Sequence, residues 1–293
     1  MPAGSVSSIL ENPYITQDEV NPNRKTPRRP FRIEKAPNPS NETEKLTQAS
    51  TKFKTLLEQG AIKQSMFGQA TINNLVQFME RIGIGAQRSP TYEQRTAIAN
   101  IYKYYEDIFG EDFDIVRVGA LAEFAVMSSL SRIAKTSKMP LSVVHSTPEE
   151  DLYKGADFLV KNEADNSVSA FQVKCIGMPK KPSHLIYPIY DQNSLKESVD
   201  TIIDNSWYTH DPRKAPQRDR ALGKLSGSGE RLLEFTDDEA SSTNKAFIVV
   251  PSPDNNSALF NSFSGIPSEE LFTQLYQDFH SQILVPNTQL QYA

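Results

Sequence analysis

The chain has 293 residues, 38% of them hydrophobic, and a formal net charge of −5 at pH 7. Such a chain can build a buried core for one large domain, or for one domain with a smaller addition. No apolar run approaches the ~20 residues that span a bilayer, and residues 1–10 lack the pattern of a secretory signal, so we expect no membrane partner.

The acidic net charge argues against indiscriminate coating of nucleic acid, but it leaves room for a local basic groove. The four histidines show no metal-ligand spacing. The single cysteine, Cys175, excludes a disulfide within the chain. Because a chain without disulfides suits a reducing compartment, we expect a cytoplasmic protein.

Residues 1–40 are rich in proline, asparagine and serine, with few apolar side chains to offset the entropy cost of ordering. We therefore expect a disordered tail. It carries a basic cluster made of Arg24, Lys25, Arg28, Arg29, Arg32 and Lys35. Two interpretations stay open: a mobile arm that binds phosphate groups, or a solvated tail or processing segment.

Residues 41–110 predict a helical N-terminal region with three amphipathic helices. Asn41 and Glu44 resemble a capping pair at the start of the first helix, and an apolar stripe over residues 72–82 marks the second. A Ser-Pro pair at 89–90 predicts the start of the third helix.

Two tyrosines, Tyr102 and Tyr105, lie on the apolar face of this third helix. Exposed tyrosines could stack on nucleic-acid bases. Their helical spacing with Ile98 and Ile101 favours a place in the core instead.

Residues 117–135 predict a buried helix, because the segment is apolar on most sides. Glu123 is its only acid, and its helical neighbours are small or apolar. Burying an unpaired charge costs several kcal/mol. This glutamate therefore has either a functional partner or a place in the first turn, where the helix dipole favours an acid.

A strand at residues 141–146 is followed by a predicted hairpin. Residues 156–161 and 168–176 are β-prone, and the Asn, Asp and Ser residues between them favour a turn. With the turn centred between residues 164 and 165, Asp157 lies opposite Gln172 in the neighbouring strand.

Side chains alternate between the two faces of a strand, so Gln172 and Lys174 share one face and the odd-numbered residues of 171–175 share the other. Directly opposite side chains have Cβ atoms about 4.5–5.5 Å apart. The carboxylate of Asp157, the amide of Gln172 and the ammonium group of Lys174 are therefore predicted to converge. Such a patch is the outline of a site for a metal ion and water.

Asp157, followed by Gln172-Val173-Lys174, resembles the D…(E/Q)xK signature of the PD-(D/E)XK nuclease superfamily. The variant with glutamine is similar to Mrr-type restriction endonucleases, in which a TP…D…G-x-D sequence precedes it. That sequence corresponds here to Thr147, Pro148, Asp151, Gly155 and Asp157. The resemblance covers residues 117–251.

The resemblance implies an α/β fold, with a restriction-endonuclease-like mixed central sheet flanked by helices. Residues 111–293 would form this core, in the order helix, strand, hairpin, helix and strand, and the N-terminal helices would be an appendage. A glutamate on the helix before the sheet would face the metal site, which gives Glu123 a functional role. Asp151 could be a further ligand, but a solvent-facing turn aspartate is the simpler interpretation.

The resemblance further implies a Mg²⁺-dependent deoxyribonuclease, with Mn²⁺ as an alternative ion. Asp157, the side-chain oxygen of Gln172 and the backbone carbonyl of Val173 would bind the ion. Glu123 would bind it directly or through a water. Lys174 would orient the attacking water or stabilise the charge of the transition state. Glutamine in place of the commoner glutamate removes one negative charge, which weakens metal binding. The protein could therefore also be an inactive descendant of such a nuclease.

Three further elements follow the hairpin. Ser194 and Glu197 predict a capping box at the start of a helix. Residues 245–250 predict a buried strand, and Ser268 caps a last amphipathic helix that we expect on the outside of the core.

Two long loops are expected beside the site, at residues 177–190 and, as an insertion, at residues 205–243. Both combine positive charge with aromatic side chains, which suits a phosphate backbone with exposed bases. Acidic residues are interleaved with the basic ones, so a solvated loop without a binding role remains an alternative. The candidate nucleic-acid-binding residues are Lys180, Lys181, Arg213, Lys214, Arg218 and Arg220.

Three functions therefore compete. The first is a metal-dependent DNA endonuclease of a restriction, defence or repair type, with DNA as its partner. The second is an inactive nuclease-fold protein that binds nucleic acid. The third is a structural or interaction protein in which the motif is accidental and Asp157 and Lys174 form a surface ion pair. The chain shows no separate DNA-reading module, so sequence recognition would come from loops, a homodimer or another partner.

Overall fold

A computed structural model describes residues 38–86, 89–136, 140–146, 151, 154–178, 181–210, 212–237, 240–252 and 259–284. The basic cluster of the predicted tail, the Thr147-Pro148 pair and Lys180 lie outside the described residues. Among the described residues, no helix combines the length and the apolar composition needed to cross a membrane.

The N-terminal helices are α1 (Pro39–Glu58), α2 (Gln64–Arg81) and α3 (Tyr92–Phe109). The first begins earlier than predicted, because Asn38 rather than Asn41 caps it by accepting a hydrogen bond from the Ser40 N–H at 3.0 Å. The third begins later, after Thr91. There the Thr91 N–H donates to Gln94 Oε1 at 2.7 Å and the Gln94 N–H donates to Thr91 Oγ1 at 3.3 Å. Ser89 has no such partner three residues on, which is why the cap moves.

The tyrosines of α3 are in the core, as their spacing favours. Tyr105 is fully buried and its hydroxyl pairs with that of Ser50 on α1 at 2.5 Å. Tyr102 is also buried and donates to the carbonyl of Phe263 at 2.7 Å. Neither ring is available to stack on a base.

The long helix α4 (Phe113–Thr136) is buried along most of its length. It begins before the predicted start, so Glu123 lies in its middle and not in its first turn. A favourable interaction with the helix dipole, which acts within the first turn, therefore does not explain this acid.

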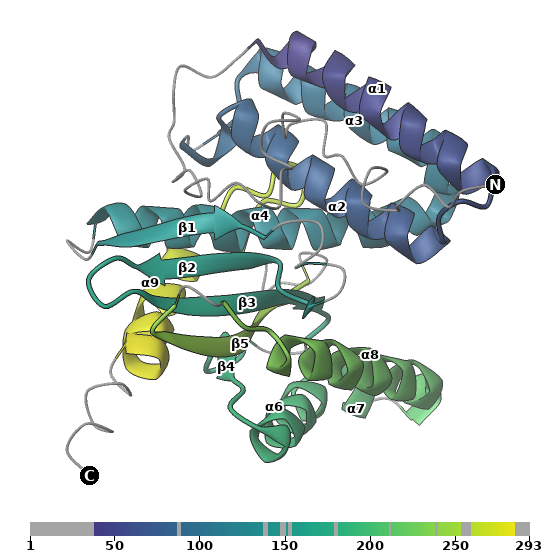
Figure 1. The fold of residues 1–293 in the computed structure, drawn as a ribbon. Coiled ribbons are helices and arrows are strands. Elements are labelled where there is room, and N and C mark those ends of the chain that lie inside the picture. The colour runs from purple at the N-terminus through teal and green to yellow at the C-terminus, as the bar shows by residue number, and fades with distance from the viewer. Residues whose placement is uncertain are drawn as a thin grey trace, which may run out of the picture.

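In the part of the chain that the structure describes, the sheet has five strands: β1 (Leu141–His145), β2 (Phe158–Asn162), β3 (Ser167–Ile176), β4 (Ile186–Pro188) and β5 (Ser242–Pro251). Their order in space is β1-β2-β3-β5-β4 (Figure 1). Only the β3–β5 pair is parallel, so the sheet is mixed.

The β2–β3 hairpin has the predicted register, with Phe158 opposite Phe171. Its turn is stabilised as the composition indicates: the Asp165 side chain accepts a hydrogen bond from the Ser167 N–H at 2.9 Å. Asn166 takes a positive φ of 57°, a conformation that asparagine tolerates better than most residues.

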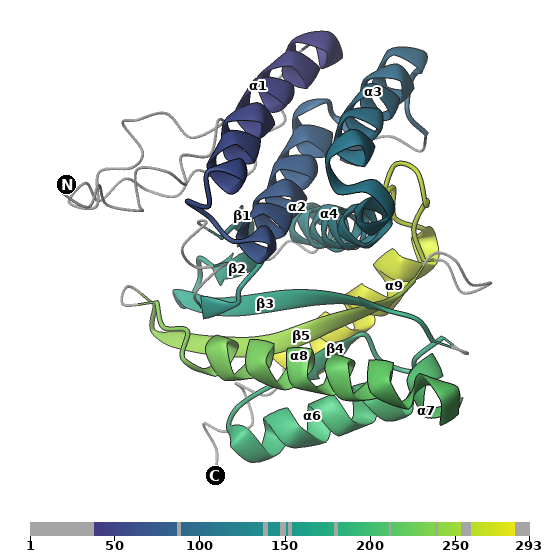
Figure 2. The ribbon, with the colours of Figure 1, turned by 90° about the vertical axis from the view of Figure 1, so that its right-hand side faces the viewer.

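Helices cover both faces of the sheet (Figure 2). On one face, α4 and α9 (Glu269–Phe279) share a core with Phe171 and Val173 of β3. On the other face, α6 (Gln192–Asp204) and α8 (Ala215–Leu233) share a core with Ala170. The alternation predicted for β3 is thus observed, and the fold is α/β with a mixed sheet between helical layers.

Two predictions about peripheral elements are changed by the packing. Helix α9 is capped by Ser268 as predicted, but Leu271 and Leu275 belong to the main core rather than to its outside. The N-terminal helices also share this core, through Leu75 and Val76 of α2 and Ile98 of α3. Helices α2 and α3 pack on α4, and α1 packs on α2 and α3.

The predicted insertion loop at 205–243 is wrong, because most of it is helical. It contains α7 (Trp207–His210) and the helix α8. Pro216 lies in the first turn of α8, where a missing N–H costs nothing. Gly229 lies where a Cβ would clash with Leu195 of α6 and meet the Phe247 ring at 3.1 Å. Pro216 therefore serves helix entry, and Gly229 serves close packing.

The segment 177–190 is also partly ordered, since it contains β4. The following helix, α6, begins after Asp191, and Ser194 occupies its third position. Ser194 Oγ accepts hydrogen bonds from the Asp191 N–H at 2.9 Å, and its own N–H donates to Asp191 Oδ1 at 2.8 Å. The capping box is real, but Asp191 replaces the predicted Ser194 as the cap.

Candidate active site

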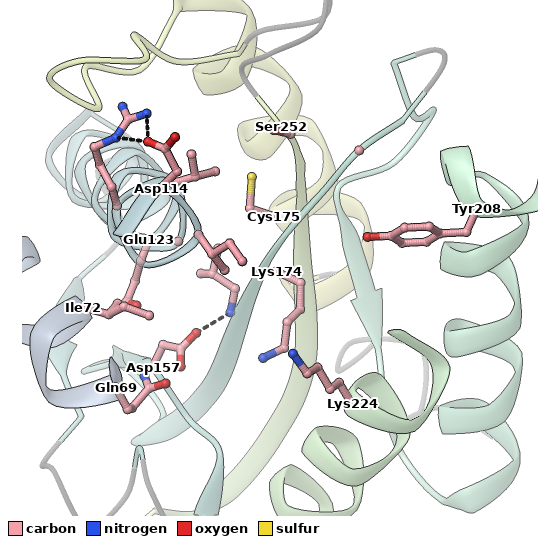
Figure 3. Close-up of a pocket in the computed structure, with 16 residues that line it drawn as sticks. Gln69, Ile72, Asp114, Glu123, Asp157, Lys174, Cys175, Tyr208, Lys224 and Ser252 are labelled. Atoms are coloured by element: carbon pink, nitrogen blue, oxygen red, sulfur yellow. Dashed lines mark hydrogen bonds and ion pairs between the residues drawn. The ribbon is translucent and has the colours of Figure 1, made fainter. Parts of the chain in front are cut away.

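The predicted site residues come from three elements that meet at one place (Figure 3). Glu123 comes from the middle of α4, Asp157 from the residue before β2, and Lys174 from β3. All three line a cavity of about 690 Å³, together with Val173 and, from α2, Gln69. Two of the three side chains predicted to converge at the hairpin, Asp157 and Lys174, therefore line one cavity, and Glu123 of α4 lines it too. Gln172 lines an adjoining cavity that it shares with Lys174.

Asp157 is held by the backbone of the neighbouring strand. Its Oδ2 accepts a hydrogen bond from the Val173 N–H at 2.6 Å, and its own N–H donates to the Phe171 carbonyl at 2.8 Å. The side chain is 5% exposed. Burial raises the pKa of Asp157 to about 6, and the charge of Lys174 and the Val173 N–H oppose that rise. Its orientation is fixed by the sheet, but its charge is only partly compensated.

Glu123 and Gln172 each have a buried oxygen with no hydrogen-bond partner among the described residues. These atoms are Glu123 Oε1 and Gln172 Oε1, and both residues are 4% exposed. Leaving a buried acceptor unsatisfied costs about 1–3 kcal/mol. Burial and the nearby carboxylate of Asp157 hold the pKa of Glu123 well above its usual range. Glu123 lines the cavity that Asp157 and Lys174 also line, so a cation or an ordered water bound there would satisfy its free oxygen. Gln172 lines an adjoining cavity.

Asp151 belongs to the same cluster, contrary to the prediction of a solvent-facing turn residue. It is 5% exposed, and Gln69 Nε2 donates to its two oxygens at 2.9 and 3.1 Å. Asn73 Nδ2 also donates to it. Burial and the charge of Asp157 raise its pKa well above the usual range.

The α2 residues Gln69 and Asn73 were missed by the sequence analysis. They are four residues apart and so lie on one side of the helix. An amide pair on an otherwise apolar stripe was the available signal, but it did not identify which acid the pair would contact.

Lys174 is partly buried between two cavities. The first is the one described above, and the second, of about 540 Å³, is lined by Asp151, Gln172 and Lys174 and by α8. Burial lowers the pKa of Lys174, the acids Asp157 and Asp151 oppose that effect, and the charge of Arg231 adds to it. The amine thus releases its proton more easily than a surface lysine does.

The chemistry of this group suits a hard divalent cation. Among the described residues, no three His, Cys, Asp or Glu side chains are placed so that they could hold a metal ion. The set predicted from the sequence differs in kind: Asp157 and Glu123 are carboxylates, Gln172 offers an amide oxygen and Val173 a carbonyl. Magnesium accepts this mixture of oxygens together with water. The unsatisfied oxygen of Glu123, in the cavity that Asp157 also lines, is the structural observation that fits such an ion.

Of the predicted nucleic-acid-binding residues, the five that the structure describes do not line either cavity. Lys181 forms an ion pair with Glu270, and Lys214 lies over the Trp207 ring at 5.7 Å. Arg213, Arg218 and Arg220 are exposed in or just before the N-terminal half of α8. The cations that line the cavities from α8 are Lys224 and Arg231. The sequence analysis assigned this segment to a loop, so it did not recognise that these two residues lie on one side of a helix.

Comparisons of the chain with protein-family models, with curated proteins and with solved structures found no match. The functional argument therefore rests on the geometry of the site and on the motif.

Proposed function

We propose that this protein is a metal-dependent nuclease that hydrolyses a phosphodiester bond of DNA. The observation that carries the proposal is the cavity lined jointly by Glu123, Asp157 and Lys174, in which Glu123 Oε1 has no partner among the described residues. Gln172, whose Oε1 also lacks one, lines the adjoining cavity with Lys174. The order of elements supports it as well: α4, β1, the β2–β3 hairpin, α6 and β5 follow the helix, strand, hairpin, helix, strand order that the PD-(D/E)XK resemblance implies.

Each residue has a role that follows from its position. Asp157, Glu123 and Gln172 would hold the cation, with Asp157 oriented by the Val173 N–H. A divalent cation bound there lowers the pKa of a bound water and neutralises charge on the phosphate.

Lys174 lies beside Asp157 and borders both cavities. In its charged form it donates to a phosphate oxygen and stabilises negative charge that develops there. Its lowered pKa also brings its neutral form closer to physiological pH. The residue can therefore orient a water as well as stabilise charge.

The test is a cleavage assay on plasmid and oligonucleotide substrates with Mg²⁺, with Mn²⁺ and with a chelator. We expect cutting that the chelator abolishes, and that Asp157→Asn and Lys174→Ala reduce by about 10²–10³-fold. Matched controls are Glu163→Gln and Lys196→Ala, an exposed acid and an exposed lysine away from both cavities. No cutting by the wild type with either metal, or full activity in both site variants, would contradict the proposal.

A nuclease-fold protein that binds nucleic acid without cutting is the second candidate. It is favoured by one observation: residue 172 is a glutamine, so the expected metal set contains only two anions. Binding without cleavage in the same assay would support it. An accidental motif with a surface ion pair between Asp157 and Lys174 is not supported, because Asp157 is buried.

A further inference from the structure

One side of α8 forms a wall of the second cavity. Its contribution consists of Gly223, Lys224, Gly227, Ser228 and Arg231. The opposite wall is formed by Met66 and Gln69 of α2, and Gln172 and Lys174 lie between them. Because Gln69, Lys174 and Lys224 line both cavities, the two spaces adjoin at Lys174. The candidate active site therefore opens onto α8.

Two glycines of this wall have no explanation in the packing of the protein. A Cβ at Gly223 would meet nothing within 4 Å, and one at Gly227 would meet only the Arg231 guanidinium, at 4.0 Å. Gly229 in the same helix is different, since a Cβ there would clash with Leu195. Glycine weakens a helix interior relative to alanine, and it is used where a backbone must be approached closely. The empty space beside Gly223 and Gly227 is the cavity itself.

The same side of α8 is basic. Lys224 is exposed and makes no ion pair within the part of the chain that the structure describes. Arg231 is exposed, and its guanidinium donates to Ser228 Oγ at 3.4 Å. Arg220 precedes Lys224 by one turn. At 1.5 Å per residue the three cations span about 16 Å along the helix. Asp151, an acid that also lines the second cavity, already accepts hydrogen bonds from Gln69 and Asn73.

We infer that α8 binds the sugar–phosphate backbone of a nucleic-acid strand, which passes over Gly223 and Gly227 while Lys224 and Arg231 contact phosphates next to the cleaved one. A bare helix surface lets the backbone come close, and the cations on either side neutralise it. The inference rests on the proposed function for the identity of the cleaved bond. Binding itself needs neither the metal nor cleavage.

The experiment measures binding of a fluorescent oligonucleotide to the full-length protein by anisotropy, in chelator, so that no strand is cut. The test variant is the double change Gly223→Ala and Gly227→Ala, and the control is Gly68→Ala. Gly68 lies within α2, where a Cβ would also meet nothing within 4 Å, and it lines neither cavity. The control should melt about 2–4 °C higher than the wild type and the double variant about 4–8 °C higher, because each alanine favours the helix.

Only the α8 variant should lose affinity, by at least about tenfold, since the added methyl groups occupy the path of the strand. Lys224→Gln should weaken binding and lower the slope of log K against log salt by about 0.7–0.9. A raised melting temperature with unchanged binding in the double variant would overturn the inference. So would equal competition by inorganic phosphate or a mononucleotide, because the ligand would then be a small anion.

Failure of the proposed function has a different signature. Glycine-dependent binding by a protein that cuts no substrate would support the α8 site and reject the nuclease. Cleavage that is insensitive to both glycines would support the nuclease and reject the α8 site.

Discussion

Two buried aspartates show what separates a structural carboxylate from a functional one. Asp278 on α9 and Asp157 beside β2 are 4% and 5% exposed, and each accepts a hydrogen bond from a backbone N–H. Asp278 binds the Leu185 N–H at 2.5 Å, and His184 Nδ1 lies 3.1 Å from its second carboxylate oxygen. Both of its oxygens thus have partners, and it clamps the start of β4 to α9.

Asp157 has the same burial and the same kind of backbone contact, but its surroundings differ. The charge of Asp157 raises the pKa of two further acids, Glu123 and Asp151. Among the described residues, a buried oxygen of Glu123 and one of Gln172 have no partner, and these two residues line the two adjoining cavities. Burial alone therefore does not identify a site. Like charges gathered around unsatisfied acceptors do, because such a cluster is stabilised only when a cation or protons are supplied.

The largest expected difference between the two aspartates is in catalysis. Asp157→Asn should lower the rate of DNA cleavage by about 10²–10³-fold, because it removes an anion from the metal set. Asp278→Asn should leave the rate within about twofold and instead lower the free energy of unfolding by about 1–3 kcal/mol, because it weakens a satisfied clamp. Plasmid cleavage and urea unfolding measure the two quantities. Equal losses of activity in the two variants would erase the distinction.

The pH dependence of stability sharpens the comparison. The folded-state pKa of Asp157 is raised from 3.8 to about 6, so the folded protein binds this proton more tightly than the unfolded chain does. The contribution of Asp157 is neutral below pH 4 and becomes unfavourable as pH rises from about 4 to 6, up to about 3 kcal/mol. Asp157→Asn should therefore be more stable than the wild type at pH 7.5 and show no such advantage at pH 3.8. Urea unfolding at both values checks this, and a pH-independent difference would contradict it.

Metal binding should act on the same charges. With a Kd of about 1 mM, about 10 mM Mg²⁺ would add about 1.4 kcal/mol to the stability of the wild type. The gain should shrink at pH 5, where Asp157 is mostly protonated, and should be absent in Asp157→Asn but present in Asp278→Asn. Thermal unfolding with and without Mg²⁺ measures it. An equal gain in all three proteins would place the ion elsewhere.

A substitution at residue 172 should have a smaller effect, and it should strengthen metal binding where Asp157→Asn weakens it. Gln172→Glu adds an anion to the metal set, so Mg²⁺ should bind about tenfold more tightly, while the metal-free protein becomes less stable at neutral pH. Calorimetric titration measures the affinity and chemical unfolding the stability. Metal affinity that is unchanged by the substitution would show that the Gln172 side chain does not face the ion.

The smallest expected effect concerns the amides that hold Asp151. Gln69→Ala removes a donor from one carboxylate without touching the predicted metal set, so we expect cleavage to fall by about three- to tenfold. Gln48→Ala, on the outer helix α1, is the control, because its contact is an exposed one with Glu44 on its own helix. A loss as large as that of Asp157→Asn would instead place Gln69 in the catalytic group.

Local patterns in the sequence were sufficient for the hairpin. The alternation of side chains in β3 and the turn chemistry of residues 162–167 act over a few positions, so they determined the register and the face of Gln172 and Lys174. The apolar character of α4 likewise indicated that Glu123 is a buried acid whose charge needs a partner. These features depend on neighbours in sequence, which is why they could be predicted.

The tertiary structure decided the rest. The burial of Asp151 depends on amides 78 and 82 residues away on α2, a contact that no local pattern encodes. Helix α8 was hidden because its glycines and prolines signal a loop in isolation, whereas one glycine lets it pack against α6 and two others face a cavity. A glycine has no side chain to reveal its purpose, so only the atoms around it can distinguish close packing from an open path for a ligand.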